Sequence, residues 1–267
     1  MTEPEEIYVL NKSVRLLQPR GGFRTSLDSV MLAAACPAKA GDHVLDLGCG
    51  VGGASFCLLH RVGEARLTGI DIQADHVDLA RRNIDLNMME GRAEFLCGDV
   101  KGFSLLSSPR RKPGSSSSSA QDPGLRRDDG LLFDHVICNP PFLEAGTYTE
   151  SSSEKKATAV AHRDEDTTLK DWLDAGFRNL KNGGSFTIIH RADHTDKIIQ
   201  GLGKRFGAIE IIPLWPRAGQ PAKRVIIRAL KNRKTPTSLH PGLVLHEADG
   251  GYTKAADEIL RDAKGLV

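Results

Sequence analysis

The sequence predicts an α/β fold, in which helices cover both faces of a doubly wound, mostly parallel sheet of seven strands. Three observations support this prediction. From Gly41 onward, short β-rich apolar runs alternate with longer amphipathic segments. A glycine-rich turn follows the first run, and only a loop separates the last two runs. With 267 residues, 40% of them hydrophobic, the chain is long enough for one sizeable core.

The strands and helices are expected to alternate along the chain. Strands are predicted at 43–47, 66–71, 92–96, 132–138, 185–190, 207–213 and 223–230. Helices are predicted over about 53–61, 74–88, 168–180 and 194–205. Because no crossover helix fits between the last two strands, we expect them to pair antiparallel, giving one antiparallel edge strand. The Asn182-Gly183-Gly184 segment is expected to end the helix over 168–180.

The chain divides into three expected parts. Residues 1–40 form an entry segment, residues 41–234 form the main domain, and residues 235–267 form an extension packed on that domain. Residues 104–130 interrupt the domain with serine repeats, prolines and arginines, and show no hydrophobic periodicity. This composition favours a disordered surface insertion over a functional arm.

Composition narrows the class of protein further. The start is acidic and lacks the basic and apolar regions of a secretory signal, and no stretch approaches the roughly 18 apolar residues of a membrane span. We therefore expect a cytoplasmic protein. The cysteines are scattered and never spaced as C-x-x-C, so they predict neither a disulfide framework nor a metal site. They are Cys36, Cys49, Cys57, Cys97 and Cys138.

The segment HVLDLGCGVGGASF is interpreted as a strand, a glycine loop and the start of a helix. Gly48, Gly50 and Gly53 match the G-x-G-x-x-G spacing of a Rossmann-like dinucleotide-binding turn, which is a weak signal alone. Asp46 precedes the first glycine by two residues, where its charge would repel a pyrophosphate. S-adenosylmethionine carries an ammonium and a sulfonium but no phosphate, so Asp46 favours this cofactor over NAD.

Two further carboxylates stand at strand ends. Asp71 ends the second predicted strand, where a carboxylate can accept both ribose hydroxyls of an adenosine. Asp99 follows the third strand, where it can accept a hydrogen bond from the adenine amino group. The alternative is that both are helix N-caps or turn residues. Their position at the carboxyl ends of strands favours contact with the ligand.

The motif Asn139-Pro140-Pro141-Phe142 follows the fourth strand, at the edge along which open α/β sheets bind ligands. The prolines hold the chain extended, so that the Pro140 carbonyl and the Asn139 side-chain oxygen form two rigid acceptors. Two acceptors suit a planar amino group, whose lone pair then faces an electrophilic methyl, while Phe142 stacks on the attached ring. The alternative, an ordinary strand-ending turn, is disfavoured by the order of the two motifs.

In this order, LDLGCGVG, GID, GDV and NPPF resemble the class I S-adenosylmethionine-dependent amino methyltransferases, which have a Rossmann-like fold. More closely, the chain resembles the bacterial tRNA adenine-N6 methyltransferases that modify the adenine beside the anticodon of a valine tRNA. The segments QPRGGFRTSLDSVMLAAACP and PRAGQPAKRVIIRA extend this resemblance, from which residues 104–130 depart. The resemblance implies strand order 3-2-1-4-5-7-6, methyl transfer by in-line displacement without a metal, and Thr25 and Asp28 at the methionine end of the cofactor.

Charge is unevenly distributed in a chain whose net charge is only +2. No acidic residue lies between Glu210 and Glu247, whereas this interval holds a basic strip of Arg217, Lys223, Arg224, Arg228, Lys231, Arg233 and Lys234. The strip predicts contact with tRNA phosphates, with Trp215 as a stacking partner, although basic residues also protect strand edges. Arg163 and Arg191 are further candidates for phosphate contact.

Three hypotheses about function remain open. The first is adenine-N6 methylation of tRNA. The second is amino methylation of rRNA, DNA or a protein glutamine, because the same pair of acceptors suits a guanine, cytosine or carboxamide nitrogen. The third is an NAD-linked oxidoreductase, against which stand Asp46 and the lack of a Tyr-x-x-x-Lys pair. A non-catalytic RNA-binding module is also compatible with the basic strip.

Overall fold

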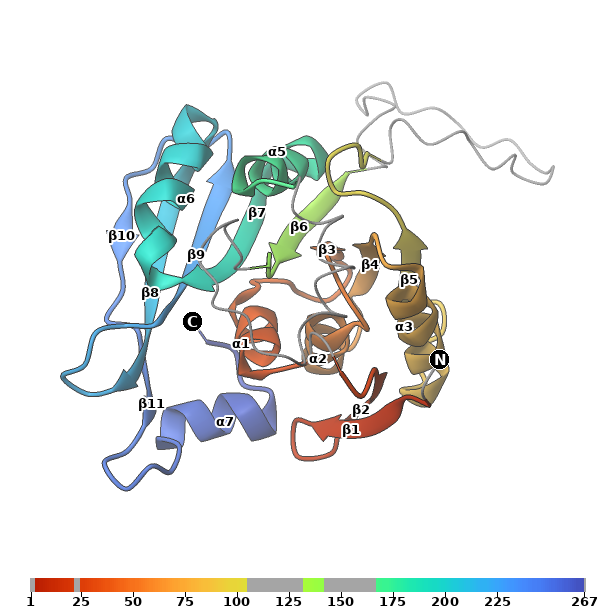
Figure 1. The fold of residues 1–267 in the computed structure, drawn as a ribbon. Coiled ribbons are helices and arrows are strands. Elements are labelled where there is room, and N and C mark those ends of the chain that lie inside the picture. The colour runs from red at the N-terminus through yellow and green to blue at the C-terminus, as the bar shows by residue number, and fades with distance from the viewer. Residues whose placement is uncertain (1–2, 22–24, 105–131, 142–166, 267) are drawn as a thin grey trace.

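The computed structural model of the protein describes residues 3–21, 25–104, 132–141 and 167–266 (Figure 1). Within these residues, a central nine-stranded sheet separates two hydrophobic clusters. One cluster packs β3 residues such as Val44 against the helices that precede and follow β3, and the other packs Leu45 against helices from later in the chain. Helices on both faces of one sheet confirm the predicted fold class.

The sheet order confirms the predicted arrangement of the seven strands. It runs β10-β8-β9-β7-β6-β3-β4-β5, with β11 also paired to β8. The bounds are β3 (His43–Leu47), β4 (Arg66–Asp71), β5 (Ala93–Cys97), β6 (Phe133–Cys138), β7 (Leu180–Arg191), β8 (Phe206–Arg217), β9 (Arg224–Lys231), β10 (Ser238–Leu239) and β11 (Leu243–His246). Read from β5 to β8, this is the order 3-2-1-4-5-7-6 of the predicted strands.

The antiparallel strand differs from the expectation in its position. β9 pairs antiparallel with both β7 and β8, so it lies inside the sheet and not at its edge. β8 returns to the parallel direction, and β10 and β11 then pair parallel with it. The C-terminal segment thus extends the sheet beyond β8.

The predicted helices are present with small shifts of their ends. The helices are α1 (Leu27–Ala35), α2 (Gly53–Arg61), α3 (Ala74–Leu86), α5 (Leu169–Asn179), α6 (Thr195–Leu202) and α7 (Lys254–Asp262). α5 begins with a capping box in which Thr168 and Asp171 each accept from the other's backbone amide. Across the described ranges, no helix is both long and apolar enough to cross a membrane.

The expected role of Asn182-Gly183-Gly184 is wrong. α5 ends at Asn179, and these three residues belong to β7. The pairing of β6 with β7 shifts register here, since Phe133 pairs with Leu180 but His135 pairs with Ser185. Gly183 has φ +78°, which an L side chain rarely adopts, so the glycines form a bulge in the strand. The 104–130 insertion lies outside the described residues except for Ser104.

The N-terminal segment forms a separate antiparallel hairpin of β1 (Glu5–Val9) and β2 (Val14–Gln18). Asn83 of α3, which is fully buried, attaches this hairpin to the core. Its side chain accepts from the amide of Leu17 and donates to the carbonyls of Leu17 and Val51. Because Val51 belongs to the glycine loop, one side chain links the entry segment to that loop.

Arg228, a member of the basic strip, stabilises the fold from inside it. Its side chain is only 11% exposed, pairs with Glu210 of β8 and donates 3.0 Å to the carbonyl of Ala35 at the end of α1. Its guanidinium therefore binds Glu210 and the Ala35 carbonyl inside the protein, whereas contact with RNA was predicted.

We expect Arg228→Ala to lower the free energy of unfolding by about 2 kcal/mol, because it leaves a half-buried carboxylate and a carbonyl unpaired. Urea denaturation measures this change. Lys234→Ala, at an exposed position, is the matched control and should change stability by less than about 0.5 kcal/mol. Equal effects of the two substitutions would contradict this role of Arg228.

Candidate active site

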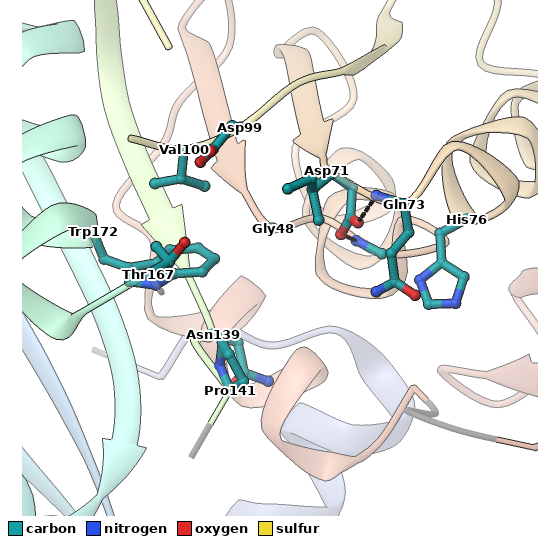
Figure 2. Close-up of a pocket in the computed structure, with 12 residues that line it drawn as sticks. Gly48, Asp71, Gln73, His76, Asp99, Val100, Asn139, Pro141, Thr167 and Trp172 are labelled. Atoms are coloured by element: carbon teal, nitrogen blue, oxygen red, sulfur yellow. Dashed lines mark hydrogen bonds between the residues drawn. The ribbon is translucent and has the colours of Figure 1, made fainter. Parts of the chain in front are cut away.

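Three parallel strands end side by side at the carboxyl edge of the sheet. In the observed register, Leu47 of β3 pairs with Ile70 of β4 and with Cys138 of β6. Gly48, Asp71 and Asn139 therefore leave the sheet at one level. They line a cavity together with Gly50, Ile72, Gln73, His76, Asp99, Val100, Pro141, Thr167 and Trp172 (Figure 2).

A carboxylate fixes the backbone of the glycine loop. Asp71 accepts from the amide of Gly50 at 2.8 Å through Oδ2 and from the amide of Gln73 at 2.9 Å through Oδ1. Gly48 and Gly50 have φ +65° and +55°, the left-handed region that favours glycine. A Cβ on Gly50 would meet no atom within 4 Å, so the loop presents bare backbone to free space in the cavity wall. The remaining lone pairs of Asp71 are suited to ribose hydroxyls.

Asp46 lies beneath the loop and not in the cavity wall. Its side chain is 2% exposed and accepts 2.6 Å from Oγ of Ser55 on α2. Burial raises the pKa of Asp46 to about 7, with the Asp71 charge adding to the increase and the Ser55 hydrogen bond opposing it. A carboxyl with this pKa is partly protonated at neutral pH, and a nearby cation would favour its ionised form. Contact with the cofactor's ammonium stays a prediction.

Asn139 presents an unpaired acceptor. Its Oδ1 is buried and has no hydrogen-bond partner among the described residues, although the residue lines the cavity. Leaving a buried polar atom unpaired costs about 1–3 kcal/mol, which an N–H of a bound ligand would offset. Pro140 is buried and Pro141 lines the cavity, so the backbone on either side is rigid. Phe142 lies outside the described residues.

The predicted cofactor residues of the entry segment lie beside the glycine loop. Thr25 contacts the start of α2, where a Cβ on Gly53 would lie 2.7 Å from Thr25 Oγ1. The third glycine of the motif is therefore needed for close packing. Asp28 is buried on α1 and accepts 2.9 Å from Nε of Arg224. Neither Thr25 nor Asp28 lines the cavity, so their contact with the cofactor stays a prediction.

Asp99 is a turn residue that also lines the cavity. It is exposed and accepts from the amide of Lys101 at 2.8 Å, as a turn residue does. It also lines the cavity, at the end of the wall formed by Val100 (Figure 2). Its contact with adenine stays a prediction.

Sequence reasoning missed several residues of the wall. Gln73 and His76 enter from the start of α3, and Thr167 and Trp172 enter from the start of α5 (Figure 2). One signal was available for the first pair, because a helix that starts directly after Asp71 brings its first turn to the same edge. No such signal existed for Trp172, since helical periodicity does not say which buried position borders a cavity.

The structure divides the basic strip. Arg224 pairs with Asp28, and the ammonium of Lys231 donates to the carbonyls of Phe177 and Leu180. Trp215, the expected stacking partner, donates from its ring nitrogen to the carbonyl of Pro241. These side chains therefore have partners within the protein.

The other predicted RNA contacts lie in different places. Arg191 ends β7 at the carboxyl edge and pairs with Asp193. Arg217, the last residue of β8, and Lys223, just before β9, are both exposed and lie at the same edge as Asn139. Arg233 and Lys234 follow the end of β9 at the opposite edge. Arg163 lies outside the described residues. RNA contact by this group stays a prediction.

Comparison with known proteins defines the class of this protein. Residues 44–110, which hold the glycine loop and Asp71, match a family model described as a methyltransferase domain. The crystal structure of a predicted O-methyltransferase from Agrobacterium tumefaciens superposes with a TM-score of 0.63 at 25% identity, covering 87% of this chain and 94% of that one. The chain is therefore an S-adenosylmethionine-dependent methyltransferase with a class I, Rossmann-like methyltransferase fold.

Similarity to individual proteins confirms the resemblance seen in the motifs. The chain is 25% identical over 243 residues to a protein of Shewanella baltica (strain OS185) named tRNA1(Val) (adenine(37)-N6)-methyltransferase, covering 90% of this chain and 92% of that protein. A protein of the same name from Shewanella halifaxensis is 29% identical over 140 residues, covering 52% of this chain and 47% of its own. A 16S rRNA N2 G1207 methyltransferase of T. thermophilus shares the fold, with a TM-score of 0.51 at 16% identity.

The raised pKa of Asp46 makes stability depend on pH. Between about pH 4 and 7, the folded protein retains a proton on Asp46 that the unfolded chain, with an ordinary aspartate, has released. Stability should therefore fall as pH rises through this window. We expect Asp46→Asn to remove this part of the dependence of stability on pH. The urea midpoint of the variant minus that of the wild type should therefore be larger at pH 7.5 than at pH 4.5. Parallel curves for the two proteins would refute a buried Asp46 with a raised pKa.

Proposed function

We propose that this methyltransferase transfers the methyl group of S-adenosylmethionine to the exocyclic N6 amino group of an adenine in tRNA, beside the anticodon. The observation that carries the proposal is that Asn139 lines the cavity and that its buried Oδ1 has no hydrogen-bond partner within the described part of the chain. An acceptor in this position suits a hydrogen of an amino group. The tRNA substrate and its position are supported by the relatives, whose names specify adenine 37 of tRNA1(Val).

The residues of the cavity have separate tasks in this reaction. Asp71 accepts the ribose hydroxyls of the cofactor, and the glycine loop lies against its amino acid end. The cofactor supplies an electrophilic methyl. Asn139 Oδ1 accepts one N6 hydrogen and so turns the nitrogen lone pair toward that methyl. The buried apolar side chains of Val100 and Trp172 would exclude water, which strengthens this orientation.

No general base is needed for this step. An aromatic amine is a weak nucleophile, but the sulfonium is a reactive donor, so orientation and desolvation supply most of the rate. The nitrogen becomes positively charged on transfer, and its extra proton then leaves to solvent. An adenine in an anticodon loop is unpaired, so its extrusion into the cavity costs less than extrusion from a duplex.

Incubation of bulk tRNA with enzyme and methyl-labelled cofactor, followed by nucleoside mass spectrometry, tests the proposal. We expect label in N6-methyladenosine. Asn139→Ala should reduce this label by about 100-fold, comparable to the loss of one oriented hydrogen-bonding group in other active sites, while RNA affinity is retained. Asn182→Ala, in the bulge of β7, is the matched control and should keep the rate. Label found only in rRNA or protein, or full activity of Asn139→Ala, would reject the proposal.

The exposed cations at the carboxyl edge should contribute to tRNA affinity. We expect the double variant Arg217→Ala, Lys223→Ala to weaken tRNA binding and to reduce the slope of log affinity against log salt by about 1–2, because each phosphate contact releases counterions. The matched control is Arg233→Ala, Lys234→Ala, which removes the same charge from the opposite edge. Fluorescence anisotropy at several salt concentrations measures both. If the two double variants reduced the slope of log affinity against log salt equally, the proposed contribution of the carboxyl-edge cations to tRNA binding would be contradicted.

A further inference from the structure

Trp172 forms part of the cavity wall. It comes from the first turns of α5, is 6% exposed, and lines the cavity together with Gly48 and Asn139 (Figure 2). A Cβ on Gly48 would lie 2.5 Å from Cη2 and 2.9 Å from Cζ3 of its ring. The six-membered part of the indole therefore rests directly against the Cα of the first loop glycine.

The reacting part of the cofactor must lie close to this ring. With the ribose at Asp71 and the amino acid end along the loop, as proposed above, the sulfonium would lie between them, next to Gly48. The proposed function places the acceptor nitrogen within hydrogen-bond distance of Asn139 Oδ1, about 3 Å. In-line transfer then requires the methyl to lie about 3–3.5 Å from that nitrogen. These constraints put the sulfonium in the section of wall that Trp172 shares with Gly48 and Asn139.

The chemistry of this section suits a cation that carries no hydrogen-bond donor. A sulfonium has no N–H or O–H, so it cannot donate a conventional hydrogen bond to a carboxylate. The neighbouring wall residues Val100 and Pro141 are apolar, and Asp46 lies below the loop. The face of an indole attracts a cation within about 6 Å more strongly than that of any other side chain.

We propose that Trp172 binds the sulfonium of S-adenosylmethionine through a cation–π interaction and thereby discriminates the charged cofactor from the neutral product S-adenosylhomocysteine. This inference rests on the proposed function for the location of the acceptor and for the placement of the cofactor's ribose at Asp71 and of its amino acid end at the glycine loop. Methyl transfer converts the sulfonium to a thioether, because the S–CH₃ bond breaks and its electron pair stays on sulfur. The thioether keeps only the weaker sulfur–aromatic contact, so the attraction declines in the step that produces the product. Trp172 thus favours substrate binding and product release together.

Calorimetric titration of the free enzyme with three ligands tests the inference without RNA. The ligands are S-adenosylmethionine, S-adenosylhomocysteine and a cationic analogue in which an aminomethine replaces the methylsulfonium. We expect Trp172→Leu to lose about tenfold in affinity for both cationic ligands, as a desolvated cation–π contact predicts, and less than about threefold for S-adenosylhomocysteine. Trp172→Phe keeps an aromatic face and should retain most of the discrimination.

The controls separate a cation effect from a packing effect. Trp215→Leu removes the other tryptophan, which lies outside the cavity, and should leave all three affinities unchanged. Thermal unfolding of each variant shows whether the fold is retained. An equal loss for charged and neutral ligands, or no loss, would overturn the inference. Because this titration uses no acceptor, it can fail while label still appears in N6-methyladenosine, and it can succeed if the acceptor proves to be another amino group.

Discussion

Parallel pairing of β3 with both β4 and β6 is the constraint on which the site depends. This register brings Leu47, Ile70 and Cys138 to one level, so the next residue of each strand enters the same cavity. The three groups at this level are the glycine loop, Asp71 and Asn139, and none of them forms a site alone. A glycine loop gives bare backbone, an aspartate gives two acceptors, and an asparagine gives one more. Under the proposed function, their common level would place the cofactor's ribose, its reactive centre and the acceptor amino group in a row along the edge of the sheet.

Two buried aspartates near this edge, Asp71 and Asp46, have different hydrogen-bond partners. Asp71 accepts hydrogen bonds from two backbone amides, one of which fixes the loop at Gly50. Asp46 has the single hydroxyl of Ser55 and is otherwise desolvated, so its pKa is raised to about 7. Asp71 therefore fixes the loop through its hydrogen bonds, whereas the charge of Asp46 changes with pH near neutrality. The glycine loop is thus anchored by one carboxylate and lies over a second carboxyl whose charge depends on pH.

Much of the fold and the centre of the site could be predicted from the sequence, because strand alternation and the two motifs are local signals. Partners distant in the chain could not. The charge of Arg224 predicted an RNA contact, but its guanidinium pairs with Asp28, 196 residues away. Asp46 was correctly placed at the loop, yet only packing shows that it lies beneath it. Trp172 carries no motif at all, since the contact of its ring with Gly48 exists only in three dimensions.

The most direct test of the central claim is a crystal structure of the enzyme with S-adenosylhomocysteine and an anticodon stem-loop that carries the target adenine. The account predicts adenine N6 about 2.7–3.2 Å from Asn139 Oδ1, with the N6 lone pair directed at the cofactor sulfur. It would be contradicted if Asn139 Oδ1 were bonded to the protein's own backbone while the adenine amino group met another acceptor.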